Sequence, residues 1–331
     1  MTAARKKIGL TTTVPVEVIY AAGCVPVDLN NVFITSPYPQ QLVEEAELAG
    51  YPRNVCAWIK GIYSTVRQNK EIRTVIAVTQ GDCSNTHALM ETLELAGIEV
   101  IPFAFPFDRG YDLLKLQIEK LIARLGTTWP QVLAVRRRLA GIRQKVWKID
   151  ELTWRENLVS GWDNHLYQVN CSDFKGDPDA YEREVDEFLA GLGTAADRRG
   201  PGAALRLGYI GVPPIMDDLY DYLEERGARV VFNETQRQFT MPFATEDFVE
   251  QYRLYTYPYG IFYRLRDIRR EIEKRRLDGI IHYAQSFCFR QIEDLIVRER
   301  IRLPILTLEG DKPNRLDART RMRIDAFLEM L

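Results

Sequence analysis

The sequence has 331 residues, of which 46% are hydrophobic and 27% are charged, enough apolar material for a packed interior and enough length for two domains. Its 44 Lys and Arg side chains nearly balance 46 Asp and Glu, giving a formal net charge of -2, so no overall field favours nucleic acid or an anionic membrane. No apolar run reaches the roughly eighteen residues of a membrane span, and the opening MTAARKKIGL lacks the apolar stretch of a signal peptide. These features predict a soluble, cytoplasmic protein.

The first part of the chain alternates short apolar, β-branched runs with helical patterns. The run TVIAVTQ ends at Gln80 and leads into a helix whose apolar residues keep helical spacing until Gly97. Continuous apolar runs with helices between them are typical of a parallel sheet covered on both faces. The expected strands are 7–12, 25–29, 74–80 and 98–103, and the expected helices are 15–22, 40–48, 57–68 and the stretch ending before Gly97.

From Tyr111 the pattern becomes helical, with no convincing strand. One amphipathic stripe runs from Leu113 to Leu125, and Thr128-Trp-Pro130 resembles a helix start. The stretch 193–204, GTAADRRGPGAA, is rich in small residues, Gly and charge, and predicts a linker. The expected domains are an N-terminal α/β lobe at 1–110, a helical insert at 111–195 and a C-terminal α/β lobe at 196–331.

After the linker the strand and helix alternation returns. The predicted fold class is therefore α/β, with two doubly wound parallel-sheet lobes (Rossmann or flavodoxin-like) and a helical insert between them. In the helix that starts at Phe289, the side chains of Phe289, Ile292, Leu295 and Ile296 are expected to face inward. The expected strands are 205–212, 229–232, 279–285 and 304–311, and the expected helices are 216–227, 264–276, 289–301 and 318–331.

Two cysteines follow predicted strands in matching contexts. Gln80-Gly81-Asp82-Cys83 and Gln285-Ser286-Phe287-Cys288 each end a strand and enter a helix. Ligands of parallel sheets bind at this edge, and the start of the helix stabilises a thiolate, the form that binds iron and zinc. An odd number of cysteines without a secretory signal favours thiols, metal ligands or nucleophiles over disulfides. The alternative is a small buried cysteine beside a sheet, which is common.

Several ordered blocks resemble the 2-hydroxyglutaryl-CoA dehydratase D-component family, which also includes subunits of benzoyl-CoA reductase. The similarity begins near residue 7, reaches the C-terminus and is sparse in the helical insert. It implies one oxygen-sensitive 4Fe-4S cluster held by Cys56, Cys83 and Cys288, with one iron open to a substrate oxygen, water or another small ligand. With Cys83 and Cys288 at equivalent strand ends, the cluster is expected in the cleft where the lobes face. The blocks are IGLTTTVPVEVIYAAGCVPV, QGDCSNTHALMETLELAGIEV, DGIIHYAQSFC, PILTLEGD and RMRIDAFLEML.

The resemblance also implies a reaction and partners. A partner ATPase, the ATP-dependent iron-sulfur activator, supplies one low-potential electron that reaches an acyl-CoA thioester and produces a ketyl radical. The radical then expels a hydroxyl group, as in the dehydratases, or begins ring reduction, as in the reductases. A homologous subunit is expected, in a hetero- or homodimer, and the chain is its catalytic or its electron-relaying member. Two alternatives remain: a non-catalytic iron-sulfur relay or assembly protein, and a zinc-bound or metal-free α/β binding protein.

The opening segment holds the candidate catalytic groups. Glu17 follows Pro15 in the first turn of a helix, where an acidic side chain also simply complements the helix dipole. By resemblance this segment lies near the active site. Glu17 is therefore a candidate acid or base, and Thr13 and Thr12 are candidate hydrogen-bond donors.

Other polar residues have an ordinary and a functional interpretation. His87 is either a surface or core imidazole or a hydrogen-bond donor to a cluster sulfur or the substrate, and His282 is expected to serve packing. Cys24 is expected in the core, and Cys171 has no obvious partner. The run RLRDIRREIEKRR is either a solvated helix face or a site for coenzyme A phosphates. Without a GxGxxG or P-loop motif, neither a nicotinamide cofactor nor ATP is expected on this chain.

Overall fold

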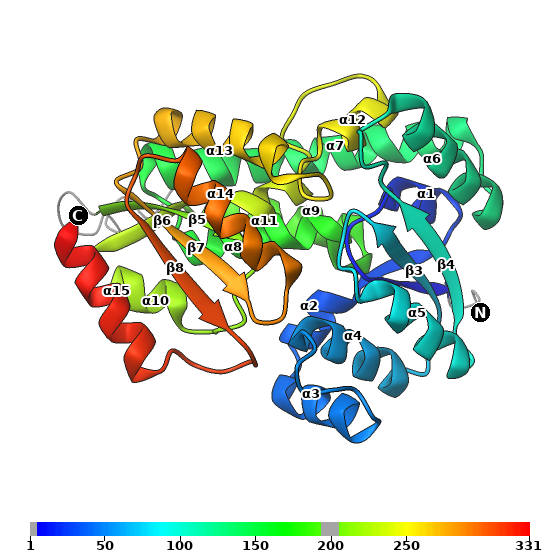
Figure 1. The fold of residues 1–331 in the computed structure, drawn as a ribbon. Helices are drawn as coiled ribbons and strands as arrows, with labels where there is room; N and C mark the ends of the chain where they lie inside the picture. The colour runs from blue at the N-terminus through cyan, green and yellow to red at the C-terminus, as the bar shows by residue number, and fades with distance from the viewer. Residues whose placement is uncertain (1–4, 193–204) are drawn as a thin grey trace. The chain divides into compact units, whose positions relative to one another are not determined.

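The computed structural model describes residues 5–192 and 205–331, which form two compact units (Figure 1). Among the described residues, the first unit consists of 5–144, 170–181 and 241–260, and the other described segments form the second. Two of the points at which the chain passes from one unit to the other lie within helices, α7 (Trp129–Glu151) and α9 (Pro178–Leu192), and the others lie after residues 169, 240 and 260. The predicted linker at 193–204 lies outside the described residues.

A four-stranded parallel sheet forms the centre of the first unit. Its strand order is β2-β1-β3-β4, and Gly9 of β1 lies opposite Val27 of β2 and Val75 of β3. The apolar runs form strands because their side chains are buried on the sheet faces. The strands are β1 (Lys7–Leu10), β2 (Val25–Asp28), β3 (Ile72–Gln80) and β4 (Glu99–Ala104).

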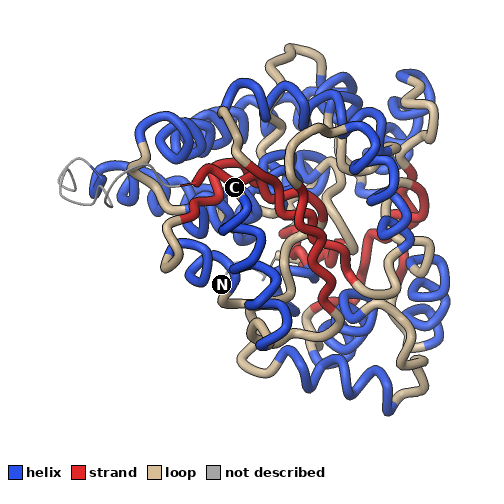
Figure 2. Tube along the Cα trace, turned by 60° about the vertical axis from the view of Figure 1, so that its left-hand side comes forward, coloured by secondary structure: helices blue, strands red, loops and turns tan. Residues whose placement is uncertain are grey.

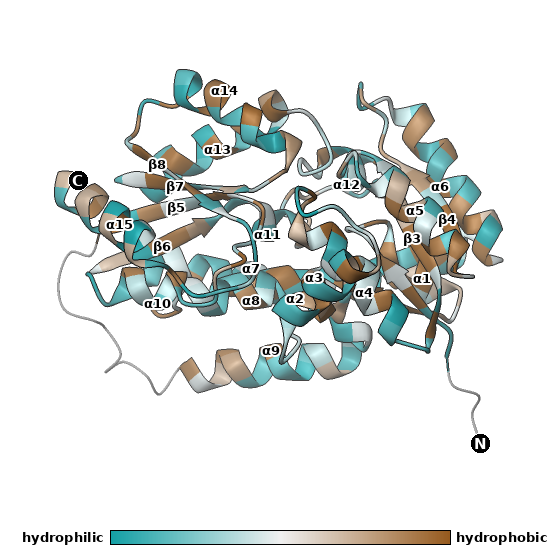
Figure 3. Ribbon diagram, turned by 60° about the horizontal axis from the view of Figure 1, so that its bottom comes forward, coloured by the Kyte–Doolittle hydropathy of each residue, from teal (hydrophilic) through white to brown (hydrophobic). Residues whose placement is uncertain are grey.

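Helices cover both faces of this sheet (Figure 1). A core cluster joins residues of α2, α4, β3 and α5, while α6 packs against β4 and α1. Hydrophilic and hydrophobic residues alternate around α6 (Figure 3); Leu114 and Ile118 are buried as predicted, but Leu113 is exposed. The helices are α1 (Val16–Ala21), α2 (Leu29–Ile34), α3 (Pro39–Leu48), α4 (Ala57–Gln68), α5 (Thr86–Leu95), α6 (Tyr111–Leu125) and α12 (Phe248–Leu254).

The second unit has a sheet of the same kind. Its strand order is β6-β5-β7-β8, again parallel throughout. Figure 1 shows α13 and α14 on one face and α10 and α15 on the other, and Figure 2 shows the red strands enclosed by blue helices. These sheets confirm the predicted α/β class. The strands are β5 (Leu205–Gly211), β6 (Ala228–Asn233), β7 (Gly279–Gln285) and β8 (Ile305–Gly310). The helices are α8 (Gly161–Val169), α10 (Leu219–Glu224), α11 (Glu234–Phe239), α13 (Ile261–Arg275), α14 (Glu293–Arg300) and α15 (Ala318–Met330).

The helix after Cys288 buries a different face from the one predicted. Phe289, Ile292 and Leu295 are exposed, whereas Val297 and Ile301 are buried against the core of the sheet. The chain first forms a short 3₁₀ turn over Phe289–Ile292, and α14 begins only at Glu293. A 3₁₀ turn advances the chain by a different angle per residue from an α-helix, so the inward stripe shifts. Of the four predicted residues, only Ile296 packs against the core.

Three short helices were not predicted from the sequence. α2 follows β2 directly and is capped by the Asp28 side chain, which accepts a hydrogen bond from Asn30 N. α11 is buried although its sequence, ETQRQF, is mostly polar. Because this sequence has no apolar stripe, its hydropathy pattern does not predict a helix. α12 lies late in the sequence yet belongs to the first unit. Cys24, expected in the core, is only partly buried.

Candidate cysteine ligands at two sheet edges

The shared strand order gives each sheet one preferred ligand-binding position. In the order 2-1-3-4 the chain crosses from one side of the first strand to the other, and the switch lies between β1 and β3, and between β5 and β7. In open α/β sheets ligands bind beyond the carboxyl ends of the strands at this switch point. Cys83 follows β3 and Cys288 follows β7. Both cysteines therefore lie where the fold itself favours a ligand.

A tight turn connects β3 to α5 and carries Cys83. Gly81 has a φ of 100°, and a Cβ atom added there would lie 2.8 Å from the backbone oxygen of Pro258. Only glycine satisfies both the left-handed backbone and this close approach. The carbonyl of Cys83 then accepts a hydrogen bond from Thr86 N at 3.0 Å, where α5 begins. The turn places Cys83 just ahead of the positive end of that helix.

Cys56 lies close to the same part of the first unit. It is the residue before α4, is 5% exposed, and belongs to a core cluster that includes Leu89 and Leu93 of α5. Cys83 packs against this same cluster. The structure therefore brings two of the three predicted ligands to one apolar region, each at the start of a helix.

Cys288 occupies the corresponding turn in the second unit. Its N-H donates to the carbonyl of Gln285 at 3.1 Å, and its own carbonyl accepts from Gln291 N at 3.1 Å as the 3₁₀ turn begins. Phe287, directly before it, has a φ of 63°. A side chain in this left-handed region is uncommon and persists only where the surroundings hold it.

Gln285 is the residue that holds this turn, and the sequence did not reveal its role. Its side chain accepts from the Tyr283 hydroxyl at 2.8 Å and donates to the carbonyl of Asp311 at 2.8 Å. Its backbone carbonyl accepts from Cys288 N and from the Gln291 amide. One feature of the sequence could have indicated this role: Gln285 is a polar residue at the end of a strand, and every position of that strand is buried in the structure.

The donor chemistry of the three cysteines fits an iron-sulfur cluster. All three side chains are thiols that precede a helical segment, and helix starts favour the thiolate. Cys56 and Cys83 come from the first unit and Cys288 from the second. Among residues 5–192 and 205–331, the structure brings together no group of three or more His, Cys, Asp or Glu side chains that could hold a metal ion.

Glu17, the candidate acid or base, is buried in a network of polar groups. Its Oε1 accepts from Arg143 at 2.7 Å and from Gln251 at 3.0 Å, and its Oε2 accepts from the Tyr252 hydroxyl at 2.5 Å. Burial alone would raise the pKa of Glu17, but the Arg143 charge and the Tyr252 hydrogen bond hold it below its usual range. The side chain is a carboxylate that ties α1 to α7 and α12.

The neighbouring threonines are also buried. Burial raises the pKa of the Tyr255 hydroxyl, and the nearby Thr13 side chain acts in the opposite direction. The hydroxyl of Thr11, the residue directly after β1, accepts from Val78 N of β3 at 3.0 Å and so joins the two neighbouring strands. These residues line the carboxyl end of β1, on one side of the switch point.

The two candidate histidines have backbone or carboxylate partners. His87 is exposed, and its Nε2 lies 2.9 Å from the carbonyl oxygen of Thr79. His282 is buried in β7, as expected, and its Nδ1 lies 2.6 Å from Asp294. Cys171 is buried 3.9 Å from the Tyr181 hydroxyl, and burial raises its pKa to about 12. That shift makes Cys171 a poor thiolate.

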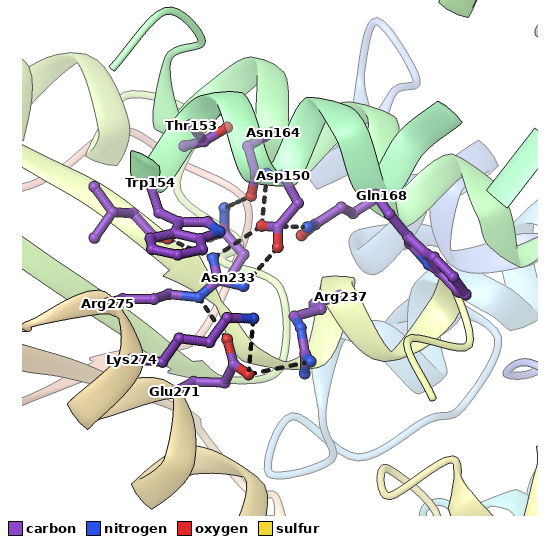
Figure 4. Close-up of polar contacts among 12 residues, drawn as sticks. Asp150, Thr153, Trp154, Asn164, Gln168, Asn233, Arg237, Glu271, Lys274 and Arg275 are labelled. Carbon is purple, nitrogen blue, oxygen red and sulfur yellow. Dashed lines mark hydrogen bonds and ion pairs between the residues drawn. The ribbon is translucent and has the colours of Figure 1, made fainter. Parts of the chain in front are cut away.

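The arginine-rich helix α13 is not simply a solvated face, contrary to one of the two interpretations. Arg275 is fully buried, donating to Asp150 at 2.5 Å and to Glu271 at 2.7 Å (Figure 4). Asp150 also accepts from Asn164 and Gln168, which joins α7, α8 and α13. Arg264 is buried in a second ion pair. Arg264 and Arg275 are therefore paired with carboxylates inside the unit. The other arginines of α13 are exposed to solvent.

A family model described as 2-hydroxyglutaryl-CoA dehydratase, D-component, matches residues 11–331. The match includes all three candidate cysteines and every strand of the two sheets except β1, which ends at Leu10. No curated protein matches the chain. Among residues 5–192 and 205–331, no helix has the length and apolar character to cross a membrane.

Proposed function

The chain belongs to the 2-hydroxyglutaryl-CoA dehydratase D-component family, and on that premise we propose that it is the iron-sulfur subunit of an acyl-CoA enzyme. The family implies a dehydratase-type lyase, and a reductase of the benzoyl-CoA type is the finer alternative. The observation that carries the proposal is the repeated position of Cys83 and Cys288, each after the third strand of a sheet with the same order.

Cys56, Cys83 and Cys288 would hold one 4Fe-4S cluster and leave one iron open. The chemistry that such a cluster supplies is delivery of one low-potential electron to a thioester carbonyl, giving a ketyl radical on the substrate. An ATP-dependent iron-sulfur activator would provide that electron, and a homologous subunit would complete the enzyme. The part of this chain is to present the thiols, bind the acyl-CoA and exclude water.

Glu17 and Thr13 remain the proposed polar groups of the active site. The Arg143 charge holds the pKa of Glu17 below its usual range, so of the two proposed roles, acid and base, Glu17 would be limited to that of a weak base. Thr13 lies beyond the carboxyl end of β1, beside the switch point, where a hydroxyl could donate to a substrate oxygen.

Anaerobic reconstitution followed by acyl-CoA addition tests this function. We expect the reconstituted chain to show the electron paramagnetic resonance spectrum of a reduced 4Fe-4S cluster, and 2-hydroxyacyl-CoA to change that spectrum by reaching the open iron. Free coenzyme A is the matched control. A cluster whose spectrum is unaffected by any acyl-CoA would support the relay alternative, and a chain that binds no iron would contradict both.

A further inference from the structure

A fully buried lysine stands beside the segment that leads to Cys56. Lys60 lies one helical turn after Cys56 in α4, and its side chain has no exposed surface. Its Nζ donates to Glu47 of α3 at 2.8 Å and to the carbonyl of Arg53 at 3.1 Å. Lysine is almost never fully buried unless it is paired. Here the ammonium group ties the loop before Cys56 to two helices.

The same loop has a second attachment at its other end. The Tyr51 hydroxyl lies 2.5 Å from Thr92 Oγ1 of α5, and the Tyr51 ring packs on Tyr63 of α4 with centroids 4.7 Å apart. Val55 N closes the loop on the carbonyl of Pro52. Residues 51–56 are therefore fixed from both sides, although they form no helix or strand.

A buried arginine stands in the equivalent relation to Cys288. Arg264 donates twice to Glu234, at 2.7 and 2.8 Å, and once to Glu293 at 2.6 Å. Glu234 also accepts from Gly211 N, at the end of β5. Glu293 begins α14, directly after the 3₁₀ turn that Cys288 starts. Arg264 thus links the carboxyl edge of the sheet to the helix that follows Cys288.

The backbone at Phe287 is strained, and the link from Arg264 to Glu293 helps to hold it. A non-glycine residue with a φ of 63° tends to relax unless its neighbours are fixed. Gln285 fixes the turn on the strand side, and Arg264 fixes it on the helix side through Glu293. The Arg264–Glu234 pair is buried on both partners and is costly to break, so it fixes the Arg264 side chain that bonds Glu293.

We propose that Lys60 and Arg264 are positioning residues, each a buried cation that holds a cysteine-bearing segment in its ligand-ready conformation in the metal-free chain. The proposal rests on the proposed function only for the statement that Cys56 and Cys288 are ligands. The ordinary alternative is that both cations contribute to general stability, like any buried ion pair.

Hydrogen exchange of the metal-free chain, resolved to peptides, separates these two accounts. Lys60→Met should accelerate exchange in residues 51–56 by at least about tenfold and leave 285–293 unchanged, and Arg264→Met should do the reverse. Arg264→Lys, which keeps one charge but not the paired donation, should fall between wild type and Arg264→Met. Alkylation of Cys56, 5% exposed in the wild type, should accelerate in Lys60→Met alone.

Two buried arginines provide matched controls. Arg136→Met removes a cation of the first unit that bonds Gln251 and Glu246, and Arg275→Met removes the cation bonded to Asp150. Neither contacts the two cysteine segments through these bonds, so neither should change their exchange selectively. If all four variants accelerate exchange uniformly, or if neither cysteine segment responds to its own cation, the positioning role is wrong. Should Lys60→Met not fold, Glu47→Gln tests the same anchor with a smaller expected effect.

Iron loading gives a second measurement. After anaerobic reconstitution, Lys60→Met and Arg264→Met should hold less iron than the controls and show a broadened cluster spectrum. If both variants load fully with an unchanged spectrum, the positioning role is contradicted. If the wild type itself binds no iron, the proposed function fails, while the exchange pattern still decides whether the two cations order these segments.

Discussion

The turns that carry Cys83 and Cys288 occupy the same position in two sheets of the same order, yet they are built differently. The first depends on Gly81, whose φ of 100° and close approach to Pro258 exclude a side chain. The second has Phe287 at a φ of 63°, a conformation that costs about 1–2 kcal/mol for a residue other than glycine. In the first turn the positive φ is allowed because Gly81 has no side chain. In the second it is held by contacts.

The preceding glutamines show the same difference. Gln80 is exposed at the end of β3, whereas Gln285 is buried and bonded at both ends of its amide group. Strand order thus places both cysteines, but the two turns keep their shapes by separate means. Variants in each turn should therefore have unequal effects.

The largest expected effect concerns the buried carboxylate and arginine pair of each unit. Glu17→Gln leaves Arg143 buried beside a neutral amide and should cost about 3–5 kcal/mol in the free energy of unfolding. Glu234→Gln should cost a similar amount, because Glu234 holds Arg264 by two hydrogen bonds. Glu91→Gln, on an exposed helix face, is the control. Urea denaturation measures all three, and a loss in only one unit would break the parallel between them.

The Glu17–Arg143 pair also predicts that the free energy of unfolding depends on pH. The pKa of Glu17 is lower in the folded chain than its ordinary value of 4.5. Its stabilisation is therefore complete above that value and is lost as the pH falls through the folded pKa. Glu17→Gln should have a flatter stability profile than the wild type on the acid side. An unchanged acid slope would mean that Glu17 does not carry this effect.

Gly81→Ala should produce the next largest loss, about 2–4 kcal/mol, because it adds both backbone strain and a clash with Pro258. Thermal unfolding with a denaturant series measures it. Gly191→Ala is the matched control, since Gly191 has no heavy atom within 4 Å of an added Cβ. A loss no larger than in the control would show that the first turn can rearrange, and the contrast with the second would disappear.

Gln285→Ala should cost about 1–3 kcal/mol, because the Tyr283 hydroxyl and the Asp311 carbonyl lose a partner in a buried place. Gln80→Ala removes the exposed counterpart and should change the free energy of unfolding by less than about 0.5 kcal/mol. Denaturation of both variants in parallel sharpens the comparison. Equal losses would mean that the two turns are held alike after all.

Among the variants of the two turns other than the controls, Phe287→Gly should have the smallest effect on the free energy of unfolding, between no change and a gain of about 1 kcal/mol. Glycine relieves the left-handed strain but loses more conformational entropy on folding, and the two terms nearly cancel. Phe289→Gly, at an exposed position of the 3₁₀ turn, relieves no strain and should destabilise slightly. If Phe287→Gly lowers the free energy of unfolding more than Phe289→Gly does, the Phe287 side chain itself stabilises the turn.

Much of this architecture was readable from the sequence because its signals are local. The strands β3 and β7 are continuous apolar runs, and each is followed within a few residues by a cysteine and a helical pattern. The α5 helix ends before Gly97, which has the positive φ expected of a helix stop. Both cysteine turns could be placed on this evidence alone.

What could not be read depends on partners far apart in the sequence. Arg275 is buried because Asp150 reaches it from α7, and no periodicity in the charged helix α13 indicates such a partner. Likewise, the polar sequence of α11 is buried because its side chains bond residues such as Asp267. The exposed Phe289 and Ile292 were misassigned because a 3₁₀ turn is indistinguishable from an α-helix in a hydropathy pattern. Cys56 was identified only through the family resemblance.

The central claim is that Cys56, Cys83 and Cys288, and not the other two cysteines, hold the cluster. The most direct measurement is the iron content and reduced spectrum of five single Cys→Ser variants after anaerobic reconstitution. Cys24→Ser and Cys171→Ser should retain the full iron content and an unchanged spectrum, whereas the three proposed ligands should each lose iron or shift the spectrum strongly. Full iron and an unchanged spectrum in Cys83→Ser and Cys288→Ser would contradict the account.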